Sequence, residues 1–111
     1  MEQVFNKLVR DRIPEIIENS GEVAETRILD DNEYMKELYK KLSEETNEVI
    51  NSNNSEETLE ELADVFEVIK SIAELNNKEI GDISKIAEQK RIKRGGFKQR
   101  IFLEKTYKKS E

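Results

Sequence analysis

Two long stretches with helical periodicity lie on either side of one short polar run, and this arrangement limits the fold more than any other feature. The run is NSNNS, residues 51–55, and consists of residues that favour turns. The flanking stretches, from about Asn32 to Asn51 and from Ser55 to about Leu75, are each long enough for a full helix. Because a short turn lets the second helix fold back along the first, the sequence predicts an antiparallel helical hairpin.

Each of these expected helices carries a pair of acidic residues. The first pair is Glu45-x-x-Glu48 and the second is Glu61-x-x-Asp64. A spacing of three residues places both carboxylates of a pair on one face of a helix, so the hairpin is expected to gather four acids. Because like charges repel, we expect cations between them, and oxygen-only ligands favour Mg²⁺, with Mn²⁺ as a substitute.

The alternative interpretation is a solvated acidic face. The chain has 25 Asp and Glu among 111 residues, so acidic pairs with this spacing are common in it. Glu45 differs from most of them because it falls in the apolar stripe that includes Leu38 and Leu42. A carboxylate in such a stripe is costly unless it is paired or bound to a metal. The residues alone leave the metal site and the solvated face as alternatives.

Composition narrows the classes of fold and of chemistry. With 40% charged residues, one Pro and four Gly, the chain suits long amphipathic helices better than a β-sandwich. It has no Cys and no His, which excludes disulfides, thiolate zinc sites and the Ser-His-Asp triad. Catalysis would therefore rest on carboxylates, Lys, Arg, Tyr and metal-bound water. No apolar run reaches the roughly 18 residues of a membrane span, and the start lacks the apolar region of a signal peptide, so we expect a cytoplasmic protein without membrane contact.

Two shorter helices complete the predicted fold. The first covers Ile13 to Asn19, with a proline in its first turn, and the other runs from Asn77 to Lys93 and stops at Gly95-Gly96. The whole chain, residues 1–111, is expected to be one all-α domain of the four-helix bundle type. Apolar positions on more than one face of the helix that begins at Ser55 predict that these helices enter a dimeric or tetrameric bundle, as a homodimer or homotetramer.

The ends of these elements carry their own signals. GEVAETRIL, residues 21–29, is expected to run extended, as a single strand or a β-turn excursion. Asp30 or Asp31 is expected to cap the second helix, and Ser55 the third.

Basic residues flank the acidic middle of the chain on both sides. The net charge of −6 argues against binding to a nucleic-acid backbone. If both basic segments fold over the hairpin, anion-binding cations lie beside metal-binding carboxylates, which is the pairing that a metal–polyphosphate complex requires. Gly95-Gly96 fits two interpretations, a helix C-cap and a close approach of backbone to phosphate. The candidate phosphate-binding residues are Lys7, Arg10, Arg12, Lys90, Arg91 and Arg94.

Four motifs together resemble a known family. They are, in order, NKLVRDRIPEII, EETNE, ELADVFEVI and KRIKRGGF followed by IFLE. In this order they resemble the MazG-like branch of the all-α nucleoside triphosphate pyrophosphatases, over residues 5–104. The chain looks most similar to the small stand-alone proteins often labelled phosphoribosyl-ATP pyrophosphohydrolase-like.

This resemblance implies hydrolysis between the α and β phosphates of a nucleotide, which releases a monophosphate and pyrophosphate. It implies that Glu45, Glu48, Glu61 and Asp64 hold Mg²⁺, with Glu44 as an outer-shell acid or extra ligand, and that the site lies near a subunit interface. Three functions remain as hypotheses. They are a pyrophosphatase that removes unwanted nucleotides, phosphoribosyl-ATP hydrolysis in histidine synthesis, and a non-catalytic acidic helical module that binds a basic partner.

Overall fold

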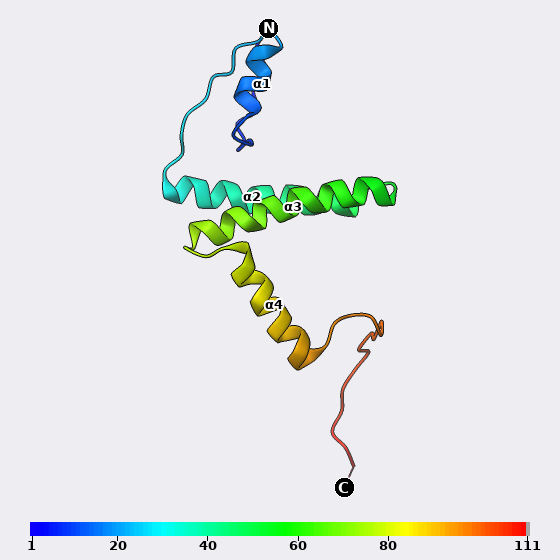
Figure 1. Ribbon diagram of the computed structural model, residues 1–111. Helices are drawn as coiled ribbons and strands as arrows, with labels where there is room; N and C mark the ends of the chain where they lie inside the picture. Colours follow the sequence, from blue (N-terminus) through cyan, green and yellow to red (C-terminus); the bar gives the residue numbers. More distant parts are fainter. Residues whose placement is uncertain (111) are drawn as a thin grey trace. The chain divides into compact units, whose positions relative to one another are not determined.

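The computed structural model describes residues 1–110, and this part of the chain is helical, with no strand (Figure 1). Within it the four helices are α1 (Ile13–Asn19), α2 (Asp31–Ile50), α3 (Ser55–Leu75) and α4 (Ile80–Arg94). The all-α prediction is confirmed. The expectation of a strand in residues 21–29 is wrong, because the described residues offer no second strand with which it could pair. This segment instead connects α1 to α2 without regular structure.

The α2/α3 hairpin forms as the polar run predicts. Asp30 caps α2, because its side chain accepts a hydrogen bond from the backbone N–H of Glu33 at 2.9 Å. Asn54, and not Ser55, caps α3 in the same way, by accepting from the N–H of Glu57 at 2.9 Å. The prediction for Ser55 is therefore wrong by one residue, since both neighbours are good capping types and the turn decides which one keeps extended backbone angles.

Side chains also hold the turn itself. The hydroxyl oxygens of Ser52 and Thr58 lie 2.6 Å apart, and the backbone N–H of Asn53 donates to the Glu57 carboxylate at 3.0 Å. Both contacts join the turn to the first residues of α3. The turn is therefore fixed in geometry, and the residues close to it on α2 and α3 keep a defined register.

Packing is concentrated in this hairpin. Within residues 1–80, α2 and α3 are the only helices that pack directly on each other. The buried side chains among the described residues are Leu38, Val68 and Ala73, at 3–7% exposure. Such a core is small for a chain of this length. Several large apolar side chains of both helices consequently stay in water, including Tyr39, Leu59 and Phe66.

The chain divides into two compact units, and each is described separately. The first comprises residues 1–80 and contains the hairpin, and the second begins at Gly81 and contains most of α4. In the second unit every described residue, from 81 to 110, is exposed.

Helix α4 begins three residues later than the sequence predicts, at Ile80, because Asn77 ends α3 instead of starting α4. Asn77 has a left-handed backbone, with φ of 60°. Its N–H donates to the carbonyl of Glu74 at 3.0 Å, and the N–H of Lys78 donates to the carbonyl of Ala73 at 2.9 Å. These two bonds make a Schellman motif, in which asparagine tolerates the left-handed position usually taken by glycine. At the other end, Gly95 has φ of 84° and closes α4, as predicted.

A candidate metal centre between the two long helices

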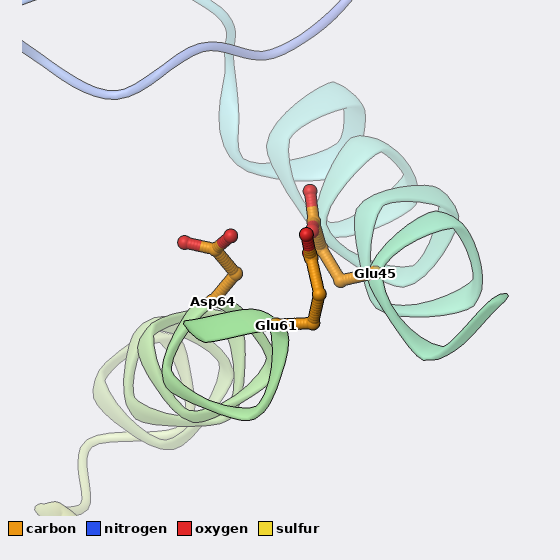
Figure 2. A group of neighbouring side chains, drawn as sticks. All are labelled: Glu45, Glu61 and Asp64. Carbon is orange, nitrogen blue, oxygen red and sulfur yellow. The ribbon is translucent and has the colours of Figure 1, made fainter. Parts of the chain in front are cut away.

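Three of the predicted acids meet between α2 and α3. Glu45, Glu61 and Asp64 each offer one carboxylate oxygen, and these three oxygens lie within 4.8 Å of one another. Figure 2 shows Glu45 reaching from α2 toward Glu61 and Asp64 on α3. All three residues are half-buried. The predicted gathering of acids from both helices is therefore present for these three.

The register of the hairpin explains why these residues meet. Glu45 lies five residues before the end of α2, and Glu61 lies six residues after the first residue of α3. Residues at similar distances from the turn come level in an antiparallel pair of helices. Asp64 is one turn further along α3 than Glu61 and lies on the same side of that helix.

The cluster raises the pKa of the Glu61 carboxyl above its ordinary value. Burial is the largest cause, followed by the negative charge of Glu48 and then by those of Asp64 and Glu45. Glu48 is exposed, yet its charge acts on Glu61, so the fourth predicted acid belongs to the same electrostatic site. Among the described residues the Glu61 carboxylate forms no hydrogen bond and no ion pair. It is the carboxylate of the cluster that gains most from an added cation.

Two cations already contact the cluster. Lys41 Nζ lies 3.6 Å from the Glu45 carboxylate, one helical turn away, and both side chains are largely buried, at 22% and 16% exposure. Arg10 Nη2 donates to Asp64 Oδ1 at 2.6 Å. Lys41 was missed by the motif analysis, although its spacing of four residues from Glu45 was a usable signal. Arg10 was predicted to bind phosphate, and in this structure it binds one of the predicted metal ligands.

Arg10 lies in the segment that precedes α1, and its guanidinium joins this segment to α3. Its neighbours Leu8 and Val9 are half-buried, and its carbonyl accepts a hydrogen bond from the N–H of Ile13 at 3.0 Å. The segment therefore has a defined backbone where it enters α1, and the guanidinium projects from it toward Asp64.

The remaining predicted site residues form no contact with the cluster within residues 1–80 or belong to the second unit. Lys7 Nζ lies 5.6 Å from the centre of the Phe5 ring, and Arg12 pairs with Glu15 at 3.2 Å. Glu44 is exposed on α2. The basic residues of α4 belong to the second unit, where Arg91 pairs with Glu88 at 2.8 Å. This group comprises Lys90, Arg91 and Arg94.

The donor set suits a hard divalent cation. Mg²⁺ binds carboxylate oxygens at about 2.0–2.1 Å, so two of its ligands are at most about 4.2 Å apart. A spread within 4.8 Å requires only small side-chain rotations to reach that geometry. Three carboxylates also leave coordination positions for water, which is how Mg²⁺ usually binds in proteins.

Comparisons with known proteins found no relative of this chain. No protein-family model matches the chain, and no curated protein and no solved structure matches it. In the part of the chain that the structure describes, no helix is long and apolar enough to cross a membrane.

Proposed function

We propose that this chain is a Mg²⁺-dependent nucleoside triphosphate pyrophosphohydrolase of the MazG-like type, with Mn²⁺ as a substitute metal. It would cleave between the α and β phosphates and release a nucleoside monophosphate and pyrophosphate, with disposal of unwanted nucleotides as the role. The observation that carries the proposal is the convergence of Glu45, Glu61 and Asp64 from two helices. The resemblance of the four sequence motifs supports it.

We assign the acids of the cluster two different roles, binding the metal and accepting a proton. Glu45, Glu61 and Asp64 would bind the metal directly, and Glu48, which is exposed, would be a fourth ligand. When bound, Mg²⁺ offsets phosphate charge and lowers the pKa of bound water. Glu48 and Glu44 are exposed, which makes them the carboxylates of this segment that are free to accept a proton from water. No imidazole is required for this chemistry.

Arg10 gives the site an anion-binding group. Its partner Asp64 is one of the proposed ligands, so a metal on Asp64 would weaken the ion pair and release the guanidinium. A released guanidinium can bind phosphate oxygens with two parallel hydrogen bonds. Lys7 and Arg12 lie close to it in the sequence, and the resemblance adds Lys90, Arg91 and Arg94 to the phosphate-binding set.

A non-catalytic acidic module is the second candidate, and one observation favours it. Asp64 and Glu45 already have basic partners within the chain, Arg10 and Lys41. An acidic face that is partly neutralised by its own chain can serve simply as a binding surface for a basic protein. This candidate predicts no effect of Mg²⁺ on stability, whereas a metal centre is stabilised by its metal through binding linkage.

The deciding experiment is an assay of pyrophosphate release with Mg²⁺ or Mn²⁺. The panel should contain canonical, deoxy and modified nucleoside triphosphates together with phosphoribosyl-ATP, which tests the histidine-pathway alternative. Glu61→Gln should be inactive, and Glu74→Gln, at an exposed acid further along the same helix, is the matched control. The proposal would be overturned if no compound released pyrophosphate and if neither Mg²⁺ nor Mn²⁺ changed the melting temperature of the protein.

A further inference from the structure

The chain separates its charges along its length. Residues 1–80 contain nine basic and 21 acidic residues, a formal charge of −12, whereas residues 81–111 carry +6. The net charge of −6 conceals this division. Opposite charge on two parts of one chain favours contact between a basic part and an acidic part, either within one molecule or between two copies.

The basic part exposes large apolar side chains near its end. We call residues 97–110 the arm. It has five basic residues and one acidic residue, Glu104. Its large apolar side chains are between 74% and 97% exposed, and they are Phe97, Ile101, Phe102, Leu103 and Tyr107. Soluble monomers rarely leave such a concentration of apolar surface in water, so the arm has the composition of an interaction segment.

The acidic part exposes a matching apolar surface on α3. Leu59, Leu62 and Phe66 follow helical spacing along one side of this helix and are 46–67% exposed. We call them the α3 stripe. On the neighbouring ridge of the helix lie Glu56, Glu60 and Glu67. An apolar stripe with acids beside it is complementary to an apolar arm with basic residues.

We propose that the arm of one chain packs on the α3 stripe of a second copy, and that the arm of the second copy packs on the α3 stripe of the first. Reciprocal exchange closes the assembly as a two-fold dimer and covers both apolar surfaces. The Lys and Arg side chains of the arm would lie beside Glu56 and Glu60. Salt-sensitive attraction and apolar burial would then act together.

The structure of α4 favours a second copy over the same chain. This helix places a rigid spacer of about 22 Å before the arm. To bring the arm back over its own α3 stripe, α4 would have to lie along α3, which requires an apolar face. Ile80, Ile83 and Ile86 share one side of α4, but that side continues with Lys90, Arg91 and Arg94 and is therefore not a continuous apolar face. Ile92 lies on the opposite side. An arm that projects from such a helix can reach a second molecule without that packing.

This inference does not depend on metal binding or catalysis. The spacing of the α3 stripe places it on the side of α3 away from Glu61 and Asp64. Variants in the stripe therefore test association without touching the acidic cluster. Failure of this proposal would leave the proposed function standing, and the reverse also holds.

The test uses full-length protein and two exposed double substitutions. The arm variant is Phe97→Ser with Phe102→Ser, and the stripe variant is Leu62→Ser with Phe66→Ser. Tyr39→Ser, at an exposed aromatic residue on α2, is the matched control. Light scattering at micromolar concentration should give a dimer for wild type and control. Association of both variants should be weaker by at least about tenfold. Raising salt from about 0.1 M to about 1 M should weaken the wild-type dimer.

Mixing the variants provides the sharper result. The arm variant keeps an intact stripe and the stripe variant keeps an intact arm, so the mixture should form heterodimers with one working contact. An arm variant that dimerises like wild type would overturn the proposal in favour of a direct hairpin–hairpin interface. A wild-type protein that is monomeric at every salt concentration would also overturn it, since the arm then either stays free or covers its own chain. Circular dichroism should show unchanged helix content in all variants.

Discussion

The α2/α3 hairpin and the α4 unit are both helical, yet only the hairpin has side chains that bury. In α2 and α3 apolar residues recur with helical spacing, and Leu38, Val68 and Ala73 are buried. In α4 the side that carries Ile80, Ile83 and Ile86 continues with basic residues, and no described residue from 81 to 110 is buried. The features that stabilise α4 are local to the helix, such as the Arg91–Glu88 ion pair and Gly95 at its C-terminal end. Helix-forming residues therefore define an element, and apolar periodicity decides whether it packs.

The first prediction tests this contrast through stability. Leu38→Ala should lower the free energy of unfolding by about 2–3 kcal/mol, near the low end for buried leucine because its half-exposed surroundings can collapse. Ile86→Ala, on α4, should change it by no more than about 0.5 kcal/mol, since Ile86 is half in water and alanine favours helix. Urea titration followed by circular dichroism measures both. Equal losses would show that α4 is packed in solution.

The second prediction tests whether the hairpin is the catalytic region. Glu61→Gln should reduce kcat/KM with Mg²⁺ by on the order of a hundredfold or more, because it removes an ionised oxygen ligand from the centre of the cluster. Without metal the same variant should be as stable as wild type or more stable, since it also removes repulsion. Steady-state assays and melting curves on one preparation supply both values. Full activity in Glu61→Gln would remove the proposed site.

The third prediction tests whether basic residues of α4 bind the phosphates of the substrate. Arg94 ends α4, where a cation also interacts favourably with the helix dipole. If Arg94 binds phosphate, Arg94→Ala should lower kcat/KM by about tenfold or more, because charge-assisted hydrogen bonds contribute roughly 1.5–3 kcal/mol. Mg²⁺ binding without nucleotide should not change. Normal turnover in this variant would assign the α4 cations to structure and leave Arg10 as the leading phosphate ligand.

The smallest predicted effect concerns pH, and it has opposite signs at two glutamates of the first unit. The pKa of Glu61 is raised, so its ionisation disfavours the folded state, and stability is lost as pH rises above its ordinary value of 4.5. The pKa of Glu33 is lowered by its hydrogen bond and ion pair with Arg27. That pair stabilises the fold above pH 4.5, and the contribution is lost as pH falls through the lowered pKa.

The corresponding variants separate these signs. At pH 7 without metal, Glu61→Gln should melt higher than wild type, and Glu33→Gln should melt lower. Both differences should shrink as the pH is taken below 4.5. Melting curves of the two variants across this range make the comparison. Shifts of the same sign at pH 7 would contradict the electrostatic account of the acidic cluster.

Local signals in the sequence predicted most of the fold. Pro14 and Ser20-Gly21 set the limits of α1, and the polar run set the hairpin, because these depend on residues close together in the chain. The start of α4 was misplaced because Asn77 can end a helix or precede one, and only its left-handed backbone decides between these.

The acidic cluster was predictable for a similar reason, since a known turn fixes which residues of two helices come level. Contact of Arg10 with Asp64 was not predictable, because these residues are 54 positions apart and nothing local encodes their approach. The same limit applies to the phosphate-binding residues of α4. Their role depends on the placement of a whole unit, and no spacing rule within the chain supplies that.

The ion pair between Arg10 and Asp64 has a further consequence for local opening. It closes a loop of more than fifty residues with one contact between two partly exposed side chains, and such a contact contributes at most about 1 kcal/mol. The residues that precede Arg27, which is itself tied to α2 through Glu33, can therefore detach from the hairpin at a free energy far below that of global unfolding. Amide protons in α1 should accordingly exchange with solvent much faster than those in the middle of α2 and α3. A cation that takes Asp64 from Arg10 should speed that exchange further.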